Sequence, residues 1–218
     1  IKPDYAEAHY NLGNTLKELG QLDESIARYS DAIAIKPDYV EAHSNLGATF
    51  EELGRLDEAT AHYRKAIAIR PDFAIAHNNL GGMLKELGQL DEAVASYHKA
   101  LAIKSDYSEA HSNLGVALKE LGRLDEAITH CHKALAIKPN FSETYNTLGN
   151  ALKKLGQLDE AIASYRKALA IKVDYAEAYN NLGYTLQELG QLDEAVASYR
   201  EALSIKPDLV DAGRNLLF

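Results

Sequence analysis

The sequence is poor in the residues on which several classes of protein depend. One cysteine occurs among 218 residues, which excludes an intramolecular disulfide framework. There is no tryptophan, there are only five prolines, and no apolar run comes near the roughly 18 to 20 residues that a membrane-spanning helix needs. The opening residues, IKPDYAEAH, lack the basic and apolar regions of a signal peptide, so we expect a cytoplasmic protein with no membrane insertion.

Basic charge is also scarce, because 23 lysines and arginines face 32 acidic residues and the net charge is -9. Such a chain has no electrostatic footprint for a phosphate backbone, which argues against nucleic-acid binding. No serine, cysteine or lysine stands at an interpretable spacing from a base, and no glycine-rich loop follows a strand. We therefore expect a protein that is not an enzyme and that needs no cofactor.

What the sequence does have is a period of 34 residues, at which it aligns with itself without gaps. A period of this length is typical of stacked-repeat proteins, in which each unit buries its apolar face against its neighbours. We expect a single array over 1–218, with the end of a preceding repeat at 1–5 and the start of a truncated helix at 210–218. The six repeats between them are 6–39, 40–73, 74–107, 108–141, 142–175 and 176–209.

Each repeat contains two segments with helical apolar spacing, separated by a glycine at repeat position 15. A glycine there is expected to end the first helix in the left-handed conformation. Proline near the end of most repeats stops the second helix, and Asp38 with Glu41 has the capping-box spacing at the start of the next one. The pattern predicts an all-α array of antiparallel helix pairs.

A second glycine stands at position 8, inside every first helix, although glycine there costs about 1 kcal/mol relative to alanine. This cost is understandable where two helices approach too closely for a methyl group. Alanine at position 27 of every second helix suits the same close approach. The glycines are Gly13, Gly47, Gly81, Gly115, Gly149 and Gly183.

Histidine recurs at position 4 on the apolar face of four repeats. Neighbouring helices pack about 8 to 10 Å apart, so histidines of adjacent repeats cannot share a metal ion bonded at about 2.0 to 2.1 Å. His130 and His132 lie about 200° apart on a helix and flank Cys131, which takes a core position. We expect core-filling histidines and no metal site. The four at position 4 are His9, His43, His77 and His111.

The repeated residues resemble the signature of the tetratricopeptide repeat family. In the sixth repeat its positions hold Tyr179, Leu182, Gly183, Leu186, Ala195, Tyr199, Ala202 and Pro207. The fourth repeat departs from the signature, because Cys131 replaces the aromatic residue at position 24. The resemblance implies a right-handed superhelical solenoid whose first helices line a concave groove. The Asn-Leu-Gly phrase also resembles the superhelical repeats that precede O-linked N-acetylglucosaminyl transferases.

This resemblance implies a non-catalytic protein–protein interaction scaffold that binds an extended peptide in the groove. Family members that clamp acidic tails use basic residues around positions 2, 5 and 6, which this sequence lacks, so we expect a partner that is not strongly acidic. Two alternatives stay open. The chain could be the recognition arm of a larger glycosyltransferase whose catalytic domain is absent, or a structural scaffold that self-associates end to end.

Asparagine at position 6 of the first helix is the candidate for peptide binding, with Thr147 as the one exception and Asn146 beside it. Asparagine is a mediocre helix former, but its amide can both donate to and accept from a peptide backbone. We expect a ladder of amides along the groove, whose triple replacement at Asn45, Asn79 and Asn113 by alanine leaves folding intact and weakens peptide binding. The expected binding residues are Asn11, Asn45, Asn79, Asn113, Asn146, Asn181, Tyr10, Asn14, Lys17, Lys85, Lys119, Asn150 and Tyr184.

Overall fold

The computed structural model describes residues 4–209, and every regular element in that range is an α-helix. The expected all-α fold is confirmed. The chain divides into two compact units, which lie within residues 1–105 and 106–218. The prediction of a single array with six repeats stays a prediction, and its end segments at 1–3 and 210–218 lie outside the described residues.

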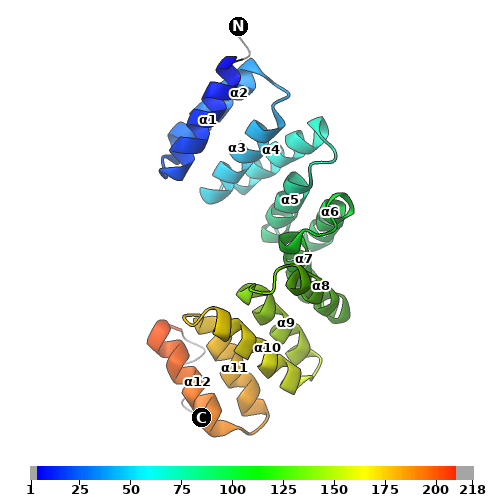
Figure 1. The fold of residues 1–218 in the computed structure, drawn as a ribbon, viewed down its shortest axis with the longest axis vertical. Coiled ribbons are helices and arrows are strands. Elements are labelled where there is room, and N and C mark those ends of the chain that lie inside the picture. Colours follow the sequence, from blue (N-terminus) through cyan, green and yellow to red (C-terminus); the bar gives the residue numbers. More distant parts are fainter. Residues whose placement is uncertain (1–3, 210–218) are drawn as a thin grey trace. The chain divides into compact units, whose positions relative to one another are not determined.

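Each unit contains three antiparallel helix pairs (Figure 1). In the first unit the pairs are α1 (Asp4–Glu18) with α2 (Leu22–Ile35), α3 (Val40–Glu52) with α4 (Leu56–Ile69), and α5 (Ala74–Glu86) with α6 (Leu90–Ile103). In the second unit they are α7 (Ser108–Glu120) with α8 (Leu124–Ile137), α9 (Ser142–Lys154) with α10 (Leu158–Ile171), and α11 (Ala176–Glu188) with α12 (Leu192–Ile205). We call the odd-numbered helices the first helices and the even-numbered helices the second helices.

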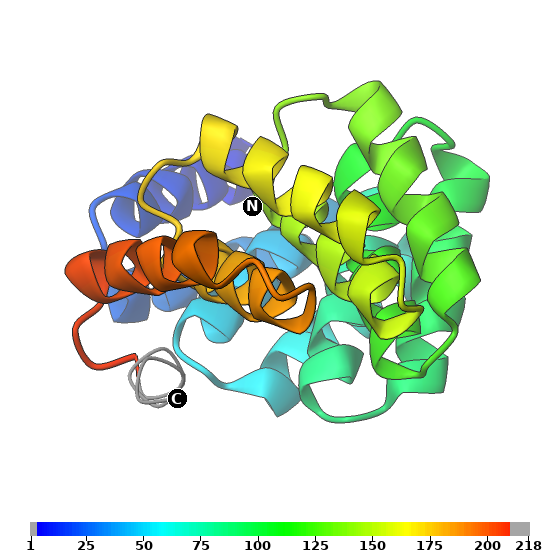
Figure 2. The ribbon, with the colours of Figure 1, turned by 90° about the horizontal axis from the view of Figure 1, so that it is seen from below.

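Within a unit, each first helix packs against its own second helix and against the second helix of the preceding pair. Neighbouring first helices also contact each other, whereas the second helices of the described residues contact only first helices. The result in each unit is a row of first helices in contact beside a row of second helices that, in the described part of the chain, do not contact one another. Figure 2 shows the helices turned by 90° from the view of Figure 1. The first helices therefore bring equivalent repeat positions close together.

The tight turn within each pair is made by the expected glycine, whose φ lies between 71° and 78° in all six pairs. In the turn after α9, the N–H of Gly156 donates to the carbonyl of Lys153 at 2.9 Å, and the N–H of Gln157 donates to Leu152 at 3.0 Å. The positive φ is what requires glycine, because nothing lies within 4 Å of the position that a Cβ would take. The sequence prediction for this turn is confirmed.

Replacement of Gly156 by alanine tests this conclusion. We expect the variant to unfold about 1 kcal/mol more easily, because only the backbone conformation is penalised. Chemical unfolding followed by circular dichroism measures the change. An unchanged unfolding midpoint would show that the turn relaxes to a conformation open to any residue.

The second glycine of each first helix does allow close packing. A Cβ on Gly13, Gly81 or Gly149 would lie 2.7, 2.6 or 2.5 Å from the ring of the tyrosine at position 24. Those tyrosines are among the largest fully buried side chains, and the alanines at position 27 are fully buried beside them. The fully buried tyrosines are Tyr29, Tyr63, Tyr97, Tyr165 and Tyr199.

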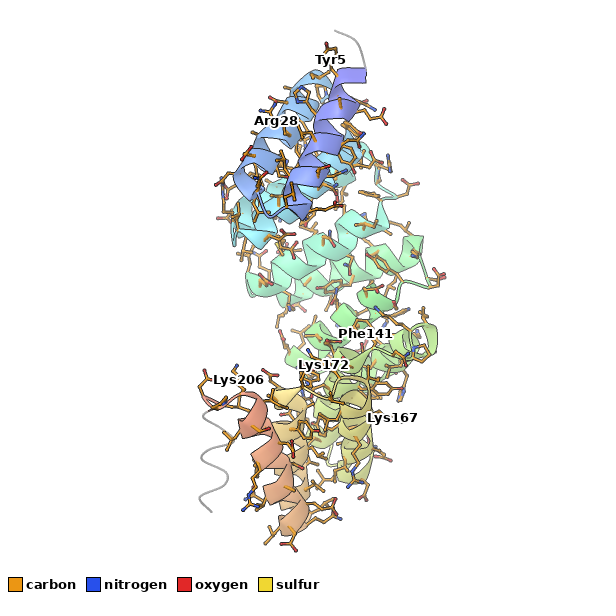
Figure 3. The ribbon with its side chains drawn as sticks, turned by 60° about the vertical axis from the view of Figure 1, so that its left-hand side comes forward. Tyr5, Arg28, Phe141, Lys167, Lys172 and Lys206 are labelled. Carbon is orange, nitrogen blue, oxygen red and sulfur yellow. The ribbon has the colours of Figure 1, made fainter. Side chains whose placement is uncertain are left out.

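The junctions between pairs differ from the expected capping boxes. The residue before each of α3, α5, α7, α9 and α11 is aromatic, with no side-chain capping hydrogen bond. The capping-box spacing of Asp or Asn with Glu occurs before α3, α7, α9 and α11 and is broken by Ile75 in α5, so the prediction of these caps is wrong for four helices. The helix starts one residue later than the capping box requires. At four junctions the cation at position 31 lies over this aromatic ring instead, and Phe141 and Lys172 of this set are labelled in Figure 3. The pairs are Lys36 with Tyr39, Arg70 with Phe73, Lys138 with Phe141, and Lys172 with Tyr175, at 4.8, 5.1, 4.5 and 4.9 Å.

Two of these cations, Arg70 and Lys138, also bind the glutamate at position 2 of their own helix pair. Arg70 contacts Glu41 at 2.7 Å and Lys138 contacts Glu109 at 3.1 Å. Each of these ion pairs joins the end of a second helix to the start of its first helix. The charges of Glu41 and Glu109 are therefore partly neutralised within their own repeats.

Candidate functional site

The candidate site is the first-helix face, which we define in each unit by positions 5, 6, 9 and 12 of its first helices. The sequence-predicted residues lie here, and most are partly exposed rather than buried. Asn11 and Tyr184 are the most open members of the set. Each of the two units has its own first-helix face.

In the first unit, the Asn45 amide connects α3 to α1. Its Nδ2 donates to Asn14 Oδ1 at 2.8 Å and to Tyr10 Oη at 3.1 Å. Asn14 Oδ1 also accepts from the hydroxyl of Tyr29 at 2.7 Å. Tyr10 packs its ring 5.0 Å from that of Tyr39. Two predicted binding residues, Asn14 and Tyr10, are therefore joined to the predicted ladder by direct hydrogen bonds.

In the second unit, Asn181 on α11 makes the corresponding connection to α9. Its Nδ2 donates to Asn146 Oδ1 at 3.0 Å, and Asn146 Nδ2 donates to Tyr175 Oη at 3.2 Å. On α9, Asn150 Oδ1 accepts from the hydroxyl of Tyr165 at 2.8 Å. Asn146 thus occupies the place in this network that Tyr10, at the same repeat position, has in the first unit.

The two networks leave the same kinds of amide atom without a partner on both faces. Among the described residues, the Oδ1 atoms of Asn45 and Asn181 and the Nδ2 atoms of Asn14 and Asn150 have no hydrogen-bond partner. None of these four atoms is buried without a partner. Each unit therefore presents a carbonyl acceptor from position 6 and an amide donor from position 9 to solvent.

The remaining asparagines at position 6 behave differently from one another. Asn79 accepts from Asn78 Nδ2 at 3.2 Å and interacts with the hydroxyl of Tyr63. Asn113 also has a partner within the chain. Asn11 is exposed on α1. The asparagines at position 6, which are interrupted only by Thr147, therefore do not form a continuous chain of equivalent hydrogen bonds.

The buried tyrosines at position 24 reach this face with their hydroxyl groups. Where position 9 is asparagine, as at Asn14 and Asn150, the hydroxyl donates to it. In the second and sixth repeats, where position 9 is not asparagine, the hydroxyl donates to position 12: Tyr63 to Glu51 at 2.7 Å and Tyr199 to Gln187 at 2.9 Å. Burial raises the pKa of Tyr63, and the Glu51 carboxylate raises it further. Burial likewise raises the pKa of Glu51.

Of the predicted lysines, Lys17 forms an ion pair with Glu52 at 2.8 Å, and Lys85 is partly exposed on α5. Lys153, which was not among the predicted residues, lies 4.0 Å from the ring centre of Tyr184. Burial lowers the pKa of Lys153. Lys119 also has a partner within the chain. The aromatic contact expected from Tyr184 is thus a contact with a neighbouring helix, although the ring is still 41% exposed.

The histidines include a feature that sequence reasoning missed. His43, His77 and His111 are buried as expected, at 5 or 6% exposure. However, two of them face a histidine at position 23 of the same repeat: the Nδ1 atoms of His43 and His62 are 3.2 Å apart, and those of His111 and His130 are 2.9 Å apart. The sequence did contain a signal for these pairs, because only the second and fourth repeats have histidine at both position 4 and position 23.

The His130-Cys131-His132 sequence does not form a cluster. Cys131 is fully buried, and burial raises the pKa of its thiol to about 12, so it is held as an unreactive thiol. His132 is exposed on α8, whereas His130 lies against His111. Within residues 4–209 no group of three or more histidine, cysteine or acidic residues is placed to hold a metal ion.

A hollow on the second-helix side of the second unit has a volume of about 600 Å³. Tyr145, Leu148 and Leu152 of α9 contribute to its walls, with Ile128 of α8 and Lys167 of α10. The Lys167 ammonium, labelled in Figure 3, lies 5.6 Å from the Tyr145 ring centre. This hollow follows from the wide spacing of the second helices.

Comparison with protein families places nearly all of the described chain in one family. A model described as TPR repeat matches residues 13–54, 50–84, 81–122 and 149–190. Two models described as tetratricopeptide repeat match 108–141 and 176–209, and 130–163. A search of curated proteins finds no match.

Solved structures support the same fold. PilW, a type IV pilus biogenesis factor, is 22% identical, with a TM-score of 0.87 over 97% of this chain and 98% of that one. YrrB, described as a TPR protein with an unusual peptide-binding site, is 23% identical, with a TM-score of 0.69 over 87% and 98% of the two chains. A thermophilic TPR protein of Thermus thermophilus is 26% identical, with a TM-score of 0.66 over 82% and 100%. No helix in the described part of the chain has the length and apolar character to cross a membrane.

Proposed function

Since the chain belongs to the tetratricopeptide repeat family, whose members are generally non-catalytic interaction scaffolds, we propose that it holds an extended peptide segment along its first-helix face. The single observation that carries the proposal is the shared polarity of the two units. Each exposes an acceptor oxygen and a donor nitrogen from amides whose other atoms are already fixed.

Fixed amides suit recognition of a peptide backbone. The hydrogen bonds from Asn45 Nδ2 to α1 hold its carbonyl in one orientation, so little side-chain entropy is lost when a ligand N–H binds there. The Asn14 amide is oriented by Tyr29 in the same way and can donate to a ligand carbonyl. A backbone offers these two groups in every residue, which makes the contact independent of ligand sequence.

The character of the ligand follows from the charges around the amides. In the first unit Lys17 is paired with Glu52, and the charge of Lys85 is offset by that of Glu51 at the same repeat position, so the face has no excess of positive charge for an acidic partner. We therefore propose a neutral or mildly basic extended segment. That YrrB, with the same fold, is described as having a peptide-binding site is in keeping with this proposal.

Peptides selected from a random 16-residue phage library on the intact chain supply a ligand for the test. We expect the triple variant Asn45→Ala, Asn79→Ala, Asn113→Ala to weaken binding of a selected peptide by at least about 1 kcal/mol, or roughly fivefold in Kd. Fluorescence anisotropy with a labelled peptide measures the change. The same variant should also lose about 1 kcal/mol of stability, because Asn45 holds two interhelical hydrogen bonds.

The control is Lys133→Ala, an exposed position on α8 away from the first helices. It should leave Kd unchanged. Binding should be measured at a temperature where circular dichroism shows both variants fully folded. If the triple variant binds the selected peptides as tightly as the natural chain, the ladder does not recognise peptides.

A further inference from the structure

We propose that each histidine pair, His43 with His62 and His111 with His130, is a binding site for one divalent transition-metal ion of the zinc and copper class. The two pairs arise at the same repeat positions, 4 and 23, in the second and fourth repeats. Each lies within one helix pair and within one unit, so the site does not depend on any contact between units. The proposal is separate from peptide binding by the first-helix face.

The separation of the two nitrogens suits a shared metal ion. Zinc binds histidine nitrogen at about 2.0 to 2.1 Å, so nitrogens 3.2 and 2.9 Å apart subtend an angle of roughly 90° to 105° at the ion. Angles in this range occur in both tetrahedral and octahedral coordination. The rings are also inclined similarly in the two sites, at 30° and 34°, with centroids 5.4 and 5.1 Å apart.

The first ring of the second-repeat pair is already oriented as a ligand. His43 Nε2 lies 3.1 Å from the carbonyl oxygen of Pro37, and a carbonyl can only accept, so Nε2 carries the proton. Nδ1 of His43 is then unprotonated, and its lone pair is directed at His62. Histidines that bind metals usually donate their other N–H to a carbonyl or carboxylate in this way, which fixes the tautomer.

In the metal-free protein, His62 must supply the proton that lies between the two Nδ1 atoms. When the ion binds, His62 exchanges this proton with solvent for one at Nε2, so both rings stay neutral and both Nδ1 lone pairs face the ion. No oxidation or net loss of a proton is required. Glu58, one helical turn before His62, adds negative charge near the ion, although it also pairs with Arg55.

The donor set indicates the class of metal. Two neutral imidazoles suit zinc, copper and nickel, whereas magnesium and calcium prefer oxygen ligands. Because no third protein ligand is in place among the described residues, the remaining coordination positions of a bound ion would be taken by water. His77 provides an internal comparison: its Nε2 also lies 2.9 Å from a proline carbonyl, but position 23 of its repeat is Ser96, so the third repeat should not bind.

Zinc titration of the untagged, chelator-treated chain by equilibrium dialysis tests the proposal. We expect two zinc ions per chain, one in His62→Gln, and none in the double variant His62→Gln, His130→Gln. The exposed control His132→Gln should keep two, and excess magnesium should not compete. Circular dichroism verifies that each variant is folded.

A second measurement needs no variant. In ¹⁵N spectra of the natural chain labelled at histidine, zinc should shift the Nδ1 signals of the paired histidines and move the His62 proton to Nε2, while the signals of His77 stay unchanged. Failure of the natural chain to bind zinc at about millimolar concentration, or two ions bound by the double variant, would overturn the proposal. The pairs would then be proton-sharing contacts of the core.

Discussion

Replacement of Gly149 by alanine is expected to destabilise the chain by about 2 kcal/mol. Alanine favours a helix by about 1 kcal/mol, so propensity alone predicts the opposite sign. However, the added Cβ would lie 2.5 and 2.8 Å from Cε1 and Cδ1 of Tyr165, which is fully buried and cannot withdraw. The helix pair α9 and α10 must therefore separate, and urea unfolding followed by circular dichroism measures the cost.

The matched control is Gly82→Ala in α5. Gly82 also lies inside a first helix, but the nearest atom to its added Cβ is the Tyr97 hydroxyl at 4.0 Å. This variant should gain about 0.5 to 1 kcal/mol from helix propensity. Opposite signs for the two glycines would separate packing from propensity. Stabilisation by both substitutions would show that the helix pairs tolerate a wider separation.

The second large effect concerns acid. Burial, together with the neighbouring His43, lowers the pKa of His62 from 6.5 to about 4, while Glu58 opposes the shift. Because the unfolded chain takes up the proton first, stability due to neutral His62 is complete above pH 6.5 and is lost as the pH falls from about 6.5 to 4. The loss should reach about 2 kcal/mol after allowance for solvent screening at this half-buried site.

Unfolding of the natural chain and of His62→Gln between about pH 7 and pH 5, with a chelator present, measures this contribution. Most carboxylates titrate below this window, so the natural chain should lose stability over it while the variant loses clearly less. His132→Gln, at an exposed position, should follow the natural chain. Parallel stability curves for the natural chain and His62→Gln would contradict the assignment.

The sequence predicted those features that repeat without exception. The turn glycines and the interior glycines recur in all six repeats, and each has one physical reason that the structure confirms, namely a positive φ or a side chain of the second helix in contact. The helix starts were predicted less well. The capping-box spacing drew attention to Asp38, whereas Tyr39 precedes the helix and lies under Lys36. Spacing alone does not distinguish a side chain that caps a helix from an aromatic residue that packs at its start.

The sequence predicted which residue types form the candidate site, but not the hydrogen bonds that these residues make. Position 6 identifies Asn45 and Asn181, yet nothing in the sequence shows that their Nδ2 atoms bind the preceding helix rather than a ligand. The histidine pair His43 and His62 was missed because the residues are 19 positions apart and on different helices. Such contacts depend on how the two helices of a pair face each other. The apolar spacing within one helix gives no information about this.

The buried tyrosines give this chain an intrinsic fluorescence that can report on the first-helix face. Without tryptophan, its near-ultraviolet emission comes from tyrosine alone. The hydroxyls of Tyr29, Tyr63 and Tyr165 end in hydrogen bonds to Asn14, Glu51 and Asn150 on the first-helix face. A molecule that competes for any of these acceptors changes the environment of a fluorophore whose ring stays in the core. Occupancy of the face can therefore be followed by intrinsic fluorescence, without a label on either partner.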